Sequence, residues 1–389
     1  MTDTAAARSP RATTILVALA AATVVAIGMS SIRGILAPTL LTLILVICAN
    51  PVRTWLLAKG VPPGLATGSV ILVVFGLLAT FTYTIVIAFA QFVDMLPDYA
   101  DEIAQIGTNV GAWLQSLGFG QAQVQSVVSG IDPGNIAGVV TNAIGSIAGI
   151  TGALVIILTM MILMAADAVY SRTILGQLRS HNPNLVLALG DYASNVRRYM
   201  VVTTVLGIAQ GALNAIALVV LQVPAALLWG LLAFLCSFIP NIGYFFAIVP
   251  PVLFGYLVGG WPTVIAVIVV YGVINAVVQS IIQPRVVGHA VSLSQTITFF
   301  SVLFWAVVIG PIGAILAVPL TLMAKTFLVD ANPESHWWRP ALGPTGETRD
   351  MARASEDEAK RDRRGRKKAA PELHAKARRR DAPDITPAG

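Results

Sequence analysis

Amide side chains recur at helical spacing inside two of the most apolar stretches of the sequence. Asn275, Gln279 and Gln283 follow one another at every fourth residue, and Gln210 and Asn214 repeat the interval earlier in the chain. Residues four apart lie on the same face of a helix. An amide donates and accepts hydrogen bonds without carrying a charge, which suits a neutral solute rich in hydroxyl groups. The alternative is structural, because amides also join neighbouring helices within a membrane.

Helix breakers interrupt two long apolar segments, 225–258 and 296–328. The breaks read "PNIG" and "GPIG", and each is followed by an apolar run that reaches another proline. The residues concerned are Pro240, Asn241, Gly243 and Pro250 in the first segment, and Gly310, Pro311, Gly313 and Pro319 in the second. A proline lacks the backbone donor of a helix and clashes with the preceding turn, so each segment splits into two short helices. Halves of about 14 to 16 residues are too short to cross a hydrocarbon core of ~30 Å.

Paired broken helices are typical of transporters in which the ends of the half-helices face the substrate near the middle of the membrane. Each broken segment is therefore predicted to form a re-entrant hairpin, which enters and leaves on the same side. The two hairpins are expected to enter from opposite faces. The alternative is a pair of ordinary spanning helices, each kinked at its proline.

The composition is that of a membrane protein with a charged tail. The chain of 389 residues is 56% hydrophobic and only 11% charged, whereas soluble domains have about 25% charged residues. Of the 44 charged side chains, 24 lie in residues 331–389. We therefore divide the chain into a transmembrane domain, 1–330, and a basic, disordered cytoplasmic tail, 331–389. The tail is expected to bind anionic lipid headgroups and, because its basic stretch 360–384 lacks aromatic residues, no nucleic acid.

Apolar stretches and charge together predict an all-α polytopic fold with about six full spans and the two broken hairpins, or seven to eight helices by ordinary counting. The expected spans are 14–29, 34–49, 65–91, 143–166, 200–221 and 262–283. Lys and Arg mark the cytoplasmic side. Segment 92–142 has acidic but no basic residues, so it is expected to be an extracytoplasmic helical insert. Segment 167–198 carries four arginines and is expected to be a cytoplasmic loop.

Ionisable and nucleophilic groups do not converge in the predicted spans. None of these spans contains Asp or Glu, which argues against coupling to protons or sodium, although backbone carbonyls at broken helices also bind sodium. Of the four histidines only His289 is close to the membrane, and Cys48 and Cys236 lie in apolar runs without a disulfide framework. We therefore expect no enzyme, no metal and no cofactor.

Small residues predict close helix contacts. Three Gly-x-x-x-Gly pairs occur, at Gly145 and Gly149, Gly207 and Gly211, and Gly255 and Gly259. Such pairs let two helix backbones approach each other in a membrane. A bundle of many spans needs these faces within one chain, so packing inside the chain is favoured, and contacts between copies in a homo-oligomer are the alternative.

Three stretches, in this order and spacing, resemble the autoinducer-2 exporter family of bacterial membrane proteins. They read "IPNIGYFFAIVPPVLFGYLVGG", "IIQPRVVGHAVSL" and "GPIGAILAVPLTLMAKTFL". The resemblance implies an integral inner-membrane protein that exports small molecules or facilitates their passage, with autoinducer-2 as the naming substrate. Some relatives are associated with sodium/proton antiport, so the family does not fix the substrate. Many relatives also have a proline where this chain reads Leu293-Ser294-Gln295.

The sequence thus predicts a transporter in the bacterial inner membrane, with both termini cytoplasmic, that exports or facilitates passage of a small polar molecule such as autoinducer-2. The expected pathway contains the amides and the breakers, together with Pro284 and Gly288 of the middle motif. Two alternatives stay open. One is a sodium/proton antiporter of the same family, and the other is a non-transporting membrane protein that recruits partners through its basic tail.

Overall fold

The computed structural model describes residues 11–130, 132–168, 170–240, 242–283, 285, 293–332, 342 and 351–358. Regular structure in these residues is helical, without a strand, which confirms the all-α prediction for the described part of the chain. In order, the first helices are α1 (Arg11–Ser31), α2 (Arg33–Ala58), α3 (Pro63–Met95), η1 (Leu96–Tyr99), α4 (Ala100–Ser116), α5 (Gln121–Gly130), α6 (Pro133–Asp167), α7 (Ser171–His181) and α8 (Pro183–Val220). The remaining ones are α9 (Ala226–Cys236), α10 (Gly243–Asn275), η2 (Ala276–Ile282), α12 (Gln295–Ile309), α13 (Pro311–Ile315), α14 (Ala317–Lys325) and η4 (Thr326–Asp330).

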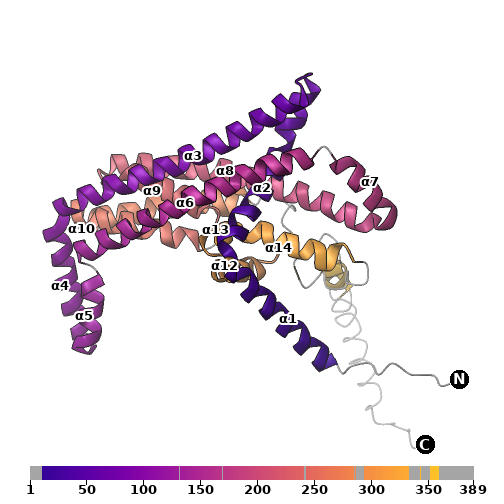
Figure 1. Ribbon diagram of the computed structural model, residues 1–389. Coiled ribbons are helices and arrows are strands. Elements are labelled where there is room, and N and C mark those ends of the chain that lie inside the picture. Colours follow the sequence, from indigo (N-terminus) through magenta and orange to yellow (C-terminus); the bar gives the residue numbers. More distant parts are fainter. Residues whose placement is uncertain are drawn as a thin grey trace, which may run out of the picture.

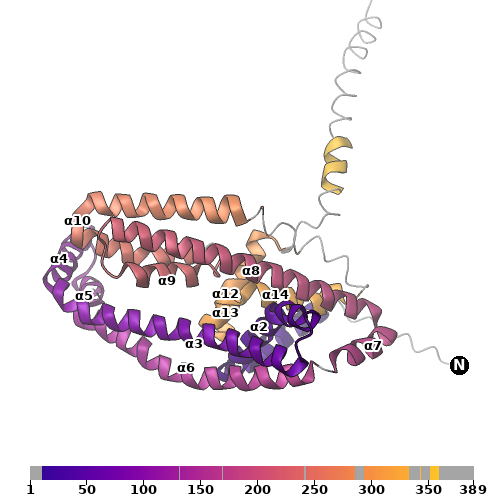
Figure 2. The same ribbon diagram turned by 90° about the horizontal axis from the view of Figure 1, so that it is seen from above.

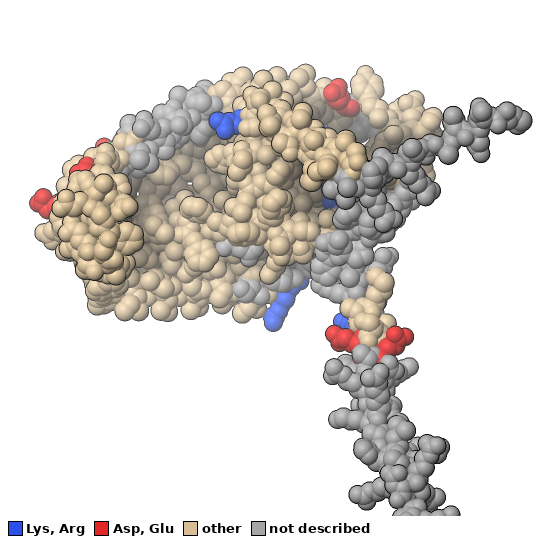
Figure 3. Space-filling view, turned by 90° about the horizontal axis from the view of Figure 1, so that it is seen from below, with Lys and Arg blue, Asp and Glu red and all other residues tan. Residues whose placement is uncertain are grey.

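The helices form an elongated bundle, with α3, α6 and α8 running along its length (Figures 1 and 2). Helices α4 and α5 lie at one end of this bundle, and α7 lies at the other. Acidic side chains gather at the α4 end in the space-filling view (Figure 3). The acidic insert and the arginine-bearing segment that follows α6 are thus separated by the length of the bundle.

Four apolar segments are long enough to cross a membrane, judged by length and composition. They are Arg33–Ala58, Pro63–Ser116, Pro183–Val220 and Gly243–Gln279. The expected spans 34–49 and 65–91 lie inside the first two, 200–221 lies inside the third except for its last residue, and 262–283 lies largely inside the fourth. The remaining two expected spans lie in α1 and α6, where the apolar stretches among the described residues are shorter, Leu16–Ser31 and Gly152–Asp167.

Two helices begin well before the spans that hydropathy marks. Helix α6 starts at Pro133, where the Asp132 carboxylate accepts hydrogen bonds from the backbone N–H groups of Gly134 and Asn135. Helix α8 starts at Pro183 after Asn182, whose side chain accepts from a first-turn N–H in the same way. A side-chain cap followed by proline favours a helix start. Segment 167–198, expected to be a loop, is therefore mostly helical.

The first broken segment folds back on itself. Helix α9 ends at Cys236 and α10 begins at Gly243, which packs directly against the Cys236 carbonyl oxygen. At the far ends of the same two helices, the rings of Trp229 and Phe254 lie 5.8 Å apart between centroids. Contacts at both ends require the two helices to run antiparallel. With 11 residues, α9 is only about 16 Å long, far short of a ~30 Å hydrocarbon core.

Helix α10 contains a second reversal, at Gly260. This residue has φ 62° and ψ −155°, a backbone conformation open essentially to glycine. Across the turn, an ideal Cβ at Gly255 would stand 3.3 Å from Thr263 and 3.4 Å from Val267. In a straight helix, residues 255 and 267 would be about 18 Å apart. We therefore divide α10 into a first arm, 243–259, that pairs with α9, and a second arm, 261–275, that runs antiparallel to the first.

The second broken segment is also a hairpin. Helix α12 starts after a cap made by Ser294, whose hydroxyl accepts a hydrogen bond from the Ile297 N–H, and ends at Ile309, just before Gly310 with φ 84°. The chain returns through α13 and α14, and Trp305 Nε1 donates a hydrogen bond to Thr321 Oγ1 at 3.0 Å. Near the turn, Gly313 packs against the Trp305 carbonyl oxygen. Both hairpins thus place a glycine of the returning arm on a carbonyl of the departing arm.

The turns of the two hairpins belong to one hydrophobic cluster. Phe238, from the first turn, shares it with Ile309 and Ala314, which flank the second turn. The same cluster includes Tyr192 and Tyr199 from the first half of α8. Helix α8 therefore runs past the place where the two hairpins approach each other.

Candidate functional site along α8

A row of polar side chains occupies the buried face of α8. Its members are Tyr192, Tyr199, Thr203, Gln210 and Asn214, each 7% exposed or less. Successive intervals of seven, four, seven and four residues keep them on one side of the helix. From first to last, the row extends about 33 Å at 1.5 Å per residue. This length matches the thickness of a bilayer core. We call these five residues the polar row.

Oxygen atoms of the polar row lack hydrogen-bond partners of good geometry within the described structure. These are the hydroxyls of Tyr192, Tyr199 and Thr203, Oε1 of Gln210 and Oδ1 of Asn214. The Tyr199 and Thr203 hydroxyls, one helical turn apart, also interact with each other. A buried polar group left unpaired costs about 1–3 kcal/mol, so native proteins keep few of them. A continuous row of such groups is suited to a solute or water that hydrogen-bonds to each in turn.

The structure joins the two amide stripes that the sequence singled out. Gln210 Nε2 donates to Asn275 Oδ1 across the contact between α8 and the second arm of α10, at 3.4 Å. This distance exceeds the usual 2.7–3.2 Å, so the bond is weak and easily exchanged. One turn before Asn275, the buried Tyr271 hydroxyl is also without a partner among the described residues. Gln279 and Gln283 are half-buried further along, beside or within the π-helical segment η2.

The remaining predicted residues divide between the two turns and the returning arms. Pro240 and Gly243 form the first turn, and Gly310, Pro311 and Gly313 form the second. Pro250 lies inside the first arm of α10 and Pro319 inside α14, so both belong to returning arms. Asn241, Pro284 and Gly288 lie outside the described residues. The described members of the predicted set therefore form two groups, amides on α8, α10 and η2 or next to η2, and breakers at the turns and in the returning arms.

Close packing of α9 holds the polar row in place. An ideal Cβ at Gly211 would stand 2.6 Å from the Gly230 carbonyl oxygen, and one at Gly207 would stand 3.1 Å from the Phe234 ring. Two helix backbones can approach this closely only where side chains are absent. This glycine pair thus serves a contact within the chain, with the amides Gln210 and Asn214 beside it.

Sequence reasoning missed four residues, Tyr192, Tyr199, Thr203 and Tyr271. Tyrosine in a membrane protein usually marks the interface with water, so burial of these hydroxyls was not expected. A signal was nevertheless present. The interval of four between Gln210 and Asn214 continues backwards as seven, four and seven along the same helix face.

Comparison with known proteins identifies the class of this fold. Residues 14–332 match the model of the AI-2E family transporters. YhhT of Escherichia coli K12, which carries the provisional name of a transport protein, is 28% identical over 317 residues, covering 81% of this chain and 90% of its own. TqsA of the same organism, named as an AI-2 transport protein, is 26% identical over 314 residues, covering 81% and 91%. MT0215 of Mycobacterium tuberculosis, with a provisional transport name, is 26% identical over 337 residues, covering 82% and 89%.

These matches define a multi-pass membrane transporter rather than an enzyme. The chain belongs to the AI-2E family of transporters. The family model includes both hairpins and the whole polar row, so the site described above lies within the part of the chain that defines the family.

Proposed function

We propose that this protein moves a small, neutral, hydrogen-bonding solute of the autoinducer-2 kind across the bacterial inner membrane, along the polar row of α8. The observation that carries the proposal is the set of unpaired buried oxygens, which extends over a length equal to a bilayer core. Uncharged donors and acceptors suit a neutral solute. The relative TqsA, named for AI-2 transport, supports this choice of solute.

The row favours facilitated export over antiport. Exchange of protons or sodium ions usually depends on carboxylates inside the membrane. The five side chains of the row are hydroxyls and amides, and so are Tyr271 and Asn275, the polar residues opposite them. Sodium/proton antiport stays the second candidate because the broken helices expose backbone carbonyls that bind sodium in other transporters.

We further propose that the two hairpins are re-entrant and approach the middle of the membrane from opposite faces. Their first arms, α9 with 11 residues and α12 with 15 residues, are about 16 and 22 Å long, and both are shorter than the core. The shared cluster of Phe238, Ile309 and Ala314 supports this arrangement. Backbone groups freed at the turns would then lie beside the pathway, where a solute or water satisfies them.

The orientation follows from the distribution of charge and can be tested by cysteine labelling. Cysteine at Ser116, the exposed end of α4, should react with an impermeant maleimide added to intact cells. Cysteine at Ser355, also exposed, should react only after the membrane is opened. Both variants need a background with Cys48 and Cys236 replaced by alanine. Labelling with the opposite pattern would overturn the topology.

Flux into proteoliposomes tests the function itself. Purified protein should carry radiolabelled autoinducer-2 with saturation, and a sodium or proton gradient should change the rate less than twofold. A rate no faster than in protein-free liposomes would contradict the proposal. A transport rate that changes at least tenfold when a sodium or proton gradient is imposed would favour antiport instead.

Deleting residues 331–389 separates transport from recruitment of partners. We expect the flux of the shortened protein to stay within twofold of the full chain, because only the last two residues of the family match are removed and every residue of the polar row is kept. Flux and reconstitution yield of the two proteins should be measured side by side. Function in cells that disappears while flux persists would show that the tail has a role of its own.

A further inference from the structure

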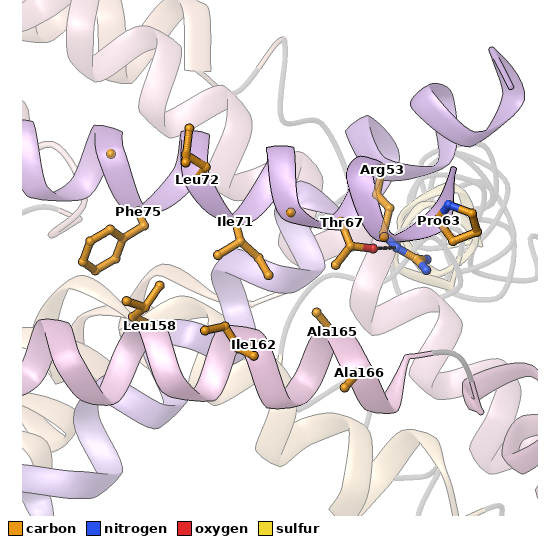
Figure 4. Close-up of a pocket in the computed structure, with 13 residues that line it drawn as sticks. Arg53, Pro63, Thr67, Ile71, Leu72, Phe75, Leu158, Ile162, Ala165 and Ala166 are labelled. Carbon is orange, nitrogen blue, oxygen red and sulfur yellow. Dashed lines mark hydrogen bonds between the residues drawn. The ribbon is translucent and has the colours of Figure 1, made fainter. Parts of the chain in front are cut away.

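A cavity of about 800 Å³ lies between α2, α3 and α6, away from the polar row (Figure 4). Its walls are apolar, with Ile71 and Phe75 from α3 facing Leu158 and Ile162 from α6. Along α3, the lining runs from residue 63 to residue 76, a length of about 20 Å. The cavity is therefore a trough, long enough for much of an extended acyl chain.

Glycines keep this trough open. Gly64, Gly68 and Gly76 line it, and an ideal Cβ at each would have no atom within 4 Å. The floor of the trough is consequently helix backbone with nothing packed above it. An exposed apolar hollow of this size is a place where a protein or a lipid is expected to bind.

One end of the trough is positively charged. The Arg53 guanidinium lines it and donates a hydrogen bond from Nε to Thr67 Oγ1 at 2.8 Å, which fixes the direction of the group (Figure 4). The remaining guanidinium donors have the planar geometry that suits phosphate oxygens. Pro63 and Gly64, the first residues of the 33-residue helix α3, line the same end. The helix N-terminus adds unpaired N–H groups and a partial positive charge there.

We infer that this trough binds an anionic phospholipid, with the phosphate at Arg53 and one acyl chain along the groove between α3 and α6. A ligand with a negative end and a long apolar body matches the charge and shape of the site. A helix from a second copy is the other occupant that an apolar hollow of this kind admits, and the experiments below separate it from a lipid. On the proposed topology, Arg53 lies in the cytoplasmic leaflet.

Native mass spectrometry of the full-length protein tests the charged end of the site. Detergent-solubilised protein is equilibrated with equal amounts of phosphatidylglycerol and phosphatidylcholine of the same acyl chains. The wild type should retain phosphatidylglycerol at least fivefold over phosphatidylcholine, and Arg53→Gln should remove this preference. Lys59→Gln is the matched control, because the Lys59 ammonium lies 3.8 Å over the Trp55 ring and is not part of the trough.

Equal retention of the two lipids by the wild type, or the same loss in Lys59→Gln as in Arg53→Gln, would overturn the inference. If Arg53→Gln does not yield monodisperse protein, Arg53→Lys and Thr67→Val take its place. Both keep the positive charge and should keep a preference of at least twofold, and loss of the preference in both would also count against the site.

A leucine at Gly68 tests the apolar body of the site. The open space above this glycine lets the side chain enter without displacing the backbone, so the trough should fill and retention of both lipids should fall at least fivefold. Gly34→Leu, at an equally open glycine outside the trough, should leave retention unchanged. Unchanged lipid retention in Gly68→Leu, with a change in oligomeric mass, would assign the trough to a second copy of the chain.

Discussion

Replacing Gly243 by alanine should prevent the protein from folding into its transporting form, and Gly313→Ala should do the same. A methyl group at either position would overlap a backbone carbonyl oxygen, that of Cys236 or that of Trp305. A carbonyl cannot rotate away as a side chain can, so the hairpin must open. We expect destabilisation of about 3 kcal/mol or more, at the upper end for overpacked sites. The yield of monodisperse protein and its thermal midpoint measure this.

Gly272→Ala is the control for these two changes. An ideal Cβ at Gly272 would stand 3.6 Å from the Tyr244 hydroxyl, an ordinary contact, so this variant should fold and transport normally. If Gly243→Ala were as stable and active as Gly272→Ala, close packing at the turn would not be needed. The main evidence for the hairpin would then be lost.

Pro240 can be separated from Gly243 in the same series. Changing both residues to alanine removes about 3 and 1 kcal/mol of bias against a continuous helix. Pro240→Ala alone leaves the close contact at Gly243 intact, so it should fold with a smaller decrease in stability. The flux of Pro240→Ala then shows what the proline contributes to transport, without a methyl group at position 243 overlapping the Cys236 carbonyl oxygen.

The sequence predicted the positions of the two helix breaks better than their geometry, which is that of a hairpin in each case. Pro240 and Gly243 lie at the first turn, and Gly310, Pro311 and Gly313 lie at the second, because proline and glycine act locally on the backbone. A kinked helix and a hairpin have the same breakers, however. The contact between Gly243 and the Cys236 carbonyl decides between them, and such a contact depends on packing that residue types do not specify.

In the polar row, too, residue types predicted some members, and others depend on packing. Gln210, Asn214 and Asn275 could be singled out because amides are unusual in apolar runs, and the structure does bring Gln210 and Asn275 together. Tyr192 and Tyr271 could not be singled out by residue type alone, because tyrosine suits both an interface with water and a helix contact. Their burial arises only when α9, α10 and the second hairpin pack around α8.

Asn214→Leu should lower the flux of autoinducer-2 at least tenfold and leave the thermal midpoint unchanged or higher. Asn214 is 1% exposed, and its Oδ1 has no partner among the described residues. Leucine is of similar size and removes an unpaired oxygen that costs about 1–3 kcal/mol when buried, so stability should not fall. If Asn214 lines the pathway, its replacement should leave the thermal midpoint unchanged or raise it. If Asn214 joins helices, the same replacement should lower the thermal midpoint.

Thr42→Val is the matched control for this change. Thr42 is also fully buried, but its hydroxyl donates to the Pro38 carbonyl oxygen of its own helix at 2.7 Å, outside the polar row. Valine should therefore leave flux within twofold of the wild type. If Asn214→Leu lost stability and flux together while Thr42→Val lost neither, the amide would be holding helices together, and the pathway would have to lie elsewhere. A selective loss of flux would instead place the solute against α8, because the only change is the polarity of one buried group.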